Sequence, residues 1–108
     1  MTVEPRGSRL EVEIARTRRE RMRGLLGRDG LGPGRALLLE RTRSVHTLGM
    51  RFALTIALLD RDLRAVHVAT VRPGRVVLPR RRVRHVLELA AGADLRVGDR
   101  LHPPPAGA

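Results

Sequence analysis

The sequence predicts an α+β, mostly β fold: a small antiparallel partial barrel of six to seven short strands with one short N-terminal helix. Apolar and polar residues alternate in several short runs, of which the clearest covers residues 50–59. A helix-start signal, Thr17-Arg18-Arg19-Glu20, follows the first of these runs. Clusters of Gly, Pro and Asp separate the other runs, as in compact β domains.

The sequence predicts that a strand is the first element of the chain and that the helix follows it. Residues 10–15 alternate between aliphatic and glutamate side chains, which predicts a half-buried strand. Thr17 and Glu20 match a capping box, because each side chain can bond the other residue's backbone amide. We expect the helix to run to about residue 26, with an apolar stripe made of Met22, Leu25 and Leu26.

The remaining runs predict strands. Residues 50–59 carry large apolar side chains on one face and small, partly apolar ones on the other, so this strand should be central and covered on both sides. A turn at residues 60–62 joins it to a second strand over residues 63–71, which gives a β-hairpin. Shorter strands are expected at residues 36–40, 76–78, 83–89 and 97–101.

Length and composition bound the organisation of the chain. A length of 108 residues fits a single domain, predicted over residues 9–102, with a flexible tail at 1–8 and a disordered Pro-rich tail at 103–108. Cys is absent, which excludes disulfides and thiolate metal sites. We find no apolar run near the ~20 residues of a membrane helix and no signal-peptide pattern, so we expect no transmembrane segment and a cytoplasmic location.

The charge has two interpretations. All 22 basic residues are arginines, and the formal net charge is +11. Such a potential attracts nucleic acid through non-specific electrostatics, whereas a coding bias toward Arg on an ordinary solvated surface gives the same composition. The densest run contains Arg80, Arg81, Arg82 and Arg84. In extended form it lines three arginines up for phosphate contact, or it protects an edge strand from aggregation.

Five segments, in order, carry a resemblance to a known family. They are residues 17–28 (TRRERMRGLLGR), 46–52 (HTLGMRF), 58–60 (LLD), 86–92 (VLELAAG) and 97–99 (VGD). With these segments the chain resembles the DUF192 family, also called UPF0127, small bacterial and archaeal domains of uncharacterised function. The resemblance implies a small, mostly antiparallel β structure with one helix, which agrees with the pattern above.

The sequence departs from the family after Phe52. Where the family usually has Pro, an aliphatic residue and Asp, this chain has Ala53, Leu54 and Thr55. Thr55 can form hydrogen bonds but carries no charge and is no base at neutral pH. If the usual Asp serves a polar site in relatives, this chain alters that site.

The best polar constellation consists of His46, Thr47, Arg51 and Glu88. Arg51 and Glu88 lie in strand patterns, where burial of either charge requires a partner, so we expect them to pair. Such a pair has a structural interpretation, in which it fixes the order of the strands. In the functional interpretation, the four residues line a small polar cleft that binds a polar or anionic ligand or a protein partner.

Other chemistry has less support. The histidines His46, His67, His85 and His102 show no close metal-ligand spacing, and a zinc site from His46, His85 and Glu88 requires the fold to bring them together. We predict no catalytic residue, metal or cofactor. Three function classes follow: an accessory binding module of the DUF192 type, a polyanion-binding protein, and, as the third, an undescribed enzyme.

Overall fold

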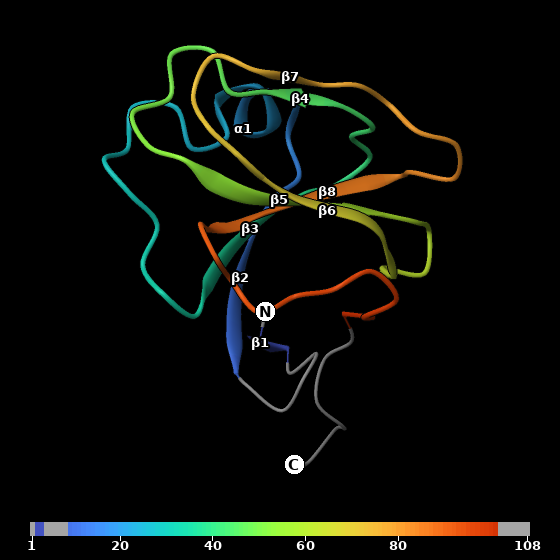
Figure 1. Ribbon diagram of the computed structural model, residues 1–108. Helices are drawn as coiled ribbons and strands as arrows, with labels where there is room; N and C mark the ends of the chain where they lie inside the picture. Colours follow the sequence, from blue (N-terminus) through green and yellow to red (C-terminus); the bar gives the residue numbers. More distant parts are fainter. Residues whose placement is uncertain (1, 4–8, 102–108) are drawn as a thin grey trace.

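The computed structural model describes residues 2–3 and 9–101 of the chain (Figure 1). The predicted mostly β fold with one short helix is confirmed. Within these residues the elements are β1 (Thr2–Val3), β2 (Leu10–Ala15), α1 (Arg18–Arg23), β3 (Arg35–Leu39), β4 (Val45–His46), β5 (Leu54–Leu59), β6 (Ala65–Val71), β7 (Val76–Val77) and β8 (His85–Ala90).

Six strands form one sheet in the order β1-β2-β3-β8-β5-β6, and β4 pairs with β7 in a separate two-stranded sheet. The large sheet stays open, with β1 and β6 at its edges, so the partial barrel does not close. Its pairs are antiparallel except β2 with β3, which is parallel. The parallel pair exists because the chain crosses over through α1 before β3 begins.

Strand β5 lies inside the sheet, between β8 and the edge strand β6, and all six of its residues are buried. The hairpin with β6 and the cover on both faces are therefore confirmed; the strand is internal as expected, but the two middle strands of the sheet are β3 and β8. The strand begins at Leu54 and not at Met50 as predicted. The amide of Met50 instead donates to the Thr47 carbonyl (3.1 Å), and Gly49 takes a left-handed conformation (φ 78°), which closes a turn ahead of the strand.

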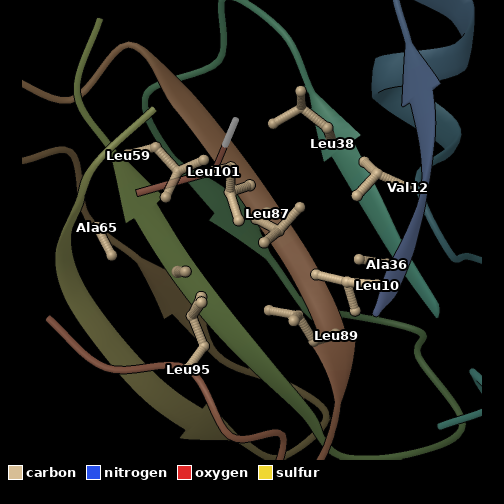
Figure 2. Close-up of a cluster of buried hydrophobic side chains, with 11 residues drawn as sticks. Leu10, Val12, Ala36, Leu38, Leu59, Ala65, Leu87, Leu89, Leu95 and Leu101 are labelled. Atoms are coloured by element: carbon tan, nitrogen blue, oxygen red, sulfur yellow. The ribbon is translucent and has the colours of Figure 1, made fainter. Parts of the chain in front are cut away.

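The two faces of the sheet bury two separate apolar clusters. Figure 2 shows the first, where side chains of β2, β3, β8 and β5 meet Leu95 and Leu101 of the C-terminal segment. The second lies on the other face, under α1 and the β4–β7 pair (Figure 1). Its buried members are Ala15, Leu25, Leu37, Leu39, Leu54, Ile56, Leu58, Val83 and Val86.

Helix α1 begins as predicted and ends early. The capping box is present: the Glu20 amide donates to Thr17 Oγ1, and the Thr17 amide donates to Glu20 Oε1, both at 3.0 Å. The hydrogen bond that the Thr17 amide donates to the Glu20 carboxyl group, together with the Thr17 side chain, lowers the pKa of Glu20. Gly24 then breaks the helix with a positive φ (49°), so the predicted stripe is wrong. Leu25 is buried, but Met22 and Leu26 are exposed.

Two described segments, Thr2–Val3 and residues 97–101, differ from the prediction. Within the expected tail at residues 1–8, Thr2–Val3 pairs with Leu10 and Glu11 as strand β1. The predicted strand at 97–101 is reduced to a single bridge between Arg64 and Arg100. Residues 4–8 and 102–108, and with them His102 and the Pro-rich tail, lie outside the described residues.

Candidate functional site

Glu88 has an ionisable side chain and lies in the middle of the sheet. It lies on β8, opposite Leu37 of β3 and Ile56 of β5, and it is 4% exposed. Because side chains alternate along a strand, Glu88 shares its face with Val86, the face that α1 and the β4–β7 pair cover. The alternation that makes β8 a central strand therefore also places a carboxyl group inside the second cluster.

The carboxyl group of Glu88 is incompletely hydrogen-bonded. Its Oε1 is buried and has no hydrogen-bond partner among the described residues. Burial raises the pKa of Glu88 to about 7, and the charge of Arg28 opposes this shift. At neutral pH the group therefore exchanges readily between its protonated and ionised forms.

Glu88 borders a cleft between α1 and β4. The cleft has a volume of about 380 Å³ and is lined by Arg18, residues 21–26, Leu39, residues 41–46, Leu48, Met50 and Glu88. We call it the Glu88 cleft. Gly24 makes room for the carboxyl group, since a Cβ at this position would lie 3.3 Å from Glu88 Oε1.

The lining of the Glu88 cleft is both basic and apolar. Five arginines contribute to it, and none of them forms an ion pair with a carboxylate within the described ranges: Arg18, Arg21, Arg23, Arg41 and Arg43. Between them lie Met22, Leu26 and Leu48, which are 74%, 43% and 51% exposed. Exposed apolar side chains next to arginines suit a ligand or partner that has an apolar part and a negative charge.

Two of the four residues predicted for the cleft line it. His46 and Glu88 do, whereas Thr47 and Arg51 do not. Thr47 is fully buried, donates to the Arg72 carbonyl (2.8 Å) and accepts from the Arg75 amide (2.9 Å). Its hydroxyl thus ties the end of β4 to the segment that leads into β7.

The predicted Arg51–Glu88 pair is wrong. Arg51 is exposed and donates through Nη1 to Asp29 Oδ1 at 2.7 Å. The reason lies in the late start of β5: Arg51 precedes Leu54 in the irregular segment, so its side chain does not follow the alternation of the strand. Glu88 keeps its buried position without a paired cation.

The arginine run before β8 is not extended. The amide of Val83 donates to the Arg80 carbonyl (3.2 Å) and Arg82 has φ 73°, so the segment makes a turn. The expected alignment of Arg80, Arg82 and Arg84 on one strand face is therefore wrong. All four arginines of the run are exposed, and polyanion binding by Arg80, Arg81, Arg82 and Arg84 stays a prediction.

The fold does not assemble the zinc site weighed from the sequence. No group of three or more His, Asp or Glu side chains within residues 2–3 and 9–101 could hold a metal ion, so His46, His85 and Glu88 stay apart. His85 accepts from the Arg41 amide through Nδ1 (3.1 Å). Burial lowers the pKa of His85, more than the opposing charge of Glu40 raises it.

Sequence reasoning missed the arginines of the cleft. Arg18 and Arg23 lie at the two ends of α1, and Arg41 and Arg43 lie in the loop after β3, which no strand pattern links to Glu88. One signal was available: Arg18 and Arg19 occupy the first helical turn, where positive charge opposes the helix dipole. Such a placement is expected where the basic surface serves contact with a ligand or partner and not the stability of the helix.

These features define a small, mostly β domain with one helix among its described residues and a cleft bordered by a buried carboxyl group. The chain belongs to the DUF192 family, described as "Uncharacterized ACR", whose family model matches residues 1–102. The resemblance inferred from the five segments is thereby confirmed. A search of curated proteins gave no match.

Two crystal structures share the fold. A protein of unknown function from Novosphingobium aromaticivorans DSM 12444 is 24% identical, with a TM-score of 0.79 over 94% of this chain and 82% of that one. A protein of Sinorhizobium meliloti 1021, described as a "putative transcription regulator", is 22% identical, with a TM-score of 0.79 over 94% of this chain and 89% of that one. At these identities the likeness concerns the fold alone. In the part of the chain that is described, no helix is long and apolar enough to span a membrane.

Proposed function

We propose that this chain is an accessory binding module whose Glu88 cleft takes a small organic anion with an apolar body and a hydroxyl or amide N–H. The observation that carries the proposal is the buried Glu88 Oε1 without a partner at the wall of a cleft lined by arginines. A buried polar atom left without a hydrogen bond costs about 1–3 kcal/mol, and a ligand that supplies the bond recovers it.

Each part of the cleft corresponds to one part of this ligand. The arginines hold the anionic group, since guanidinium forms strong, often bidentate, hydrogen bonds to oxyanions. Met22, Leu26 and Leu48 cover the apolar body and lose exposed apolar surface when they do so. Glu88 accepts the hydroxyl or amide hydrogen. We propose binding and not catalysis, because no second acid or base of the described residues hydrogen-bonds Glu88 Oε1.

The test uses two acids that differ by one hydroxyl group, 2-hydroxy-4-methylpentanoate and 4-methylpentanoate, titrated by calorimetry. The wild type should bind the hydroxy acid about tenfold more tightly, which corresponds to one charge-assisted hydrogen bond. Glu88→Leu removes the acceptor and should abolish the preference. Glu11→Leu makes the same substitution at an exposed position outside the cleft and should retain the preference.

The same titrations can reject the proposal. It fails if the wild type binds the two acids equally, or if Glu88→Leu keeps the preference for the hydroxyl group. Absence of saturable binding of both acids would also count against a ligand of this class.

A second candidate, polyanion binding, keeps some support. The net charge of +11, the exposed run Arg80, Arg81, Arg82 and Arg84, and the printed description of the Sinorhizobium protein favour nucleic acid as a partner. Affinity for duplex DNA should then fall steeply between low and moderate salt. It should also weaken in the Arg80→Ala/Arg82→Ala/Arg84→Ala variant. If no duplex binds even at low salt, this candidate is excluded.

A further inference from the structure

Arg84 belongs to a second basic hollow, separate from Glu88. This hollow has a volume of about 300 Å³ and is lined by Arg41, Arg43, Arg61, Arg84 and His85. We call it the arginine hollow. Its residues come from three segments that are distant in sequence: the loop after β3, the turn between β5 and β6, and the start of β8.

The sheet brings these three segments together. Near the end of β3, Leu39 pairs with Val86 of β8, and Leu59 at the end of β5 pairs with His85 at the start of β8. The C-terminal ends of β3 and β5 therefore lie beside the N-terminal end of β8, at one margin of the sheet. The residues that immediately follow β3 and β5, and the one that precedes β8, must meet there.

Backbone contacts hold the arginines at this margin. The amide of Arg84 donates to the Leu59 carbonyl at 2.8 Å. The amide of Arg41 donates to His85 Nδ1 at 3.1 Å, with Arg41 in a left-handed conformation (φ 53°) that a non-glycine residue adopts only when its surroundings impose it. The backbone positions of Arg41 and Arg84 are therefore fixed before any ligand binds.

The four arginines of the arginine hollow form no ion pair with a carboxylate of the described residues. Two carboxylates lie close by and are engaged elsewhere: Asp60 Oδ1 accepts the amides of Asp62 and Arg64, and Glu40 contacts Arg16 at 3.7 Å. Within the described ranges none of the four arginines forms an ion pair, and Arg84 Nη1 donates only to the Val83 carbonyl. Four arginines thus line one hollow without an ion pair among the described residues, and the charges of Glu40 and Asp60 act on its fifth residue, His85.

We propose that the arginine hollow is a binding site for a phosphoryl group. A guanidinium presents up to five donors in a rigid fork, and several of them converging need an anion with more acceptor oxygens than the two of a carboxylate. A phosphoryl group supplies three oxygens and up to two charges. Its source is either a free phosphate ester, which supplies three terminal oxygens, or the backbone of a nucleic acid, in which each phosphodiester supplies two non-bridging oxygens and one charge and neighbouring phosphates add to them.

The test measures inorganic phosphate by calorimetry and a labelled 12-base-pair DNA duplex by fluorescence anisotropy, both at fixed low salt. The Arg61→Gln/Arg84→Gln variant changes two residues that line the arginine hollow and not the Glu88 cleft. The Arg72→Gln/Arg75→Gln variant removes the same charge from exposed residues outside both hollows. Phosphate affinity should fall at least about tenfold in the first variant and less than about twofold in the second.

The duplex distinguishes the two sources. If the duplex competes with phosphate, and its salt slope falls by about two in Arg61→Gln/Arg84→Gln alone, the occupant is a nucleic-acid backbone. If phosphate binds and the duplex does not compete for the hollow, the occupant is a free phosphate ester. The proposal is overturned if the wild type binds neither probe, or if both double variants weaken binding equally, since net charge alone then explains the affinity. Unchanged thermal unfolding of both variants excludes misfolding as the cause.

Discussion

Thr47 and Glu88 are two buried polar residues on the same side of the sheet, and their surroundings differ in one respect. Thr47 is completely enclosed, and its hydroxyl donates to one backbone group and accepts from another. Glu88 is almost as deeply buried, yet its Oε1 has no partner among the described residues. The first residue closes a corner of the fold, whereas the second opens onto a cleft.

The difference shows how a buried polar group can be interpreted. A group with all its hydrogen bonds made by the chain stabilises the chain, and its removal is felt in folding. A group with an unmade bond costs stability in the free protein and gains it only when something else binds. Thr47 is therefore expected to be structural and Glu88 to be available for a ligand, although the sequence placed both in one site.

The largest expected effect concerns the pH dependence of stability through Glu88. Burial raises its pKa in the folded protein to about 7 from the ordinary 4.5. Because the folded state then binds the proton more tightly than the unfolded state, stability should fall as pH rises from about 4.5 to about 7 and level off above. Glu88→Gln does not titrate, so its stability difference from wild type should shift by about 3 kcal/mol between pH 4.5 and pH 8.

Urea unfolding of the two proteins at four pH values measures this shift, and the other titrating groups cancel in the difference. A matched comparison is Glu11→Gln, which makes the same change at an exposed strand residue. A constant difference between wild type and Glu88→Gln over this range would mean that Glu88 is solvated or paired, and the contrast with Thr47 would disappear.

The next largest effect is expected at Thr47. Thr47→Val keeps the shape of the side chain but leaves the Arg75 amide without its side-chain partner, so the free energy of unfolding should fall by about 2 kcal/mol. Thr42→Val is the control, because the Thr42 hydroxyl donates only to the Glu40 carbonyl of its own loop. If both variants lower the free energy of unfolding equally in urea at pH 7, Thr47 stabilises the fold no more than an ordinary loop threonine does.

The sequence predicts the fold better than the site for reasons visible in single elements. The alternation of side chains over Leu54–Leu59 and His85–Ala90 predicts which of them share a face. This is a local property of each strand, so it is the same in the folded sheet. The capping box at Thr17 is equally local. The start of β5 depends instead on a turn closed by Gly49 and Thr47, which the apolar pattern from Met50 onward does not reveal.

The site depends on contacts between distant segments. The sequence placed Glu88 correctly in a strand, where a carboxylate amid apolar neighbours is conspicuous. It assigned to Glu88 a cation, Arg51, that does not pair with it, since topology and not spacing decides which arginines come near Glu88. In a chain with 22 arginines, composition cannot rank one possible partner above another.

The smallest expected effect tests that assignment directly. The Arg51–Asp29 pair is exposed on both sides, 62% and 86%, so a double-mutant cycle with Arg51→Gln and Asp29→Asn should give a coupling below about 0.5 kcal/mol that disappears at high salt. Arg51→Gln should also leave the fall of stability between pH 4.5 and 8 as steep as in the wild type. If Arg51 paired with Glu88, its charge would hold the folded pKa down, and its removal would make the fall deeper. An unchanged pH profile in Arg51→Gln, together with the loss of that profile in Glu88→Gln, separates the solvated surface pair from the buried carboxyl group.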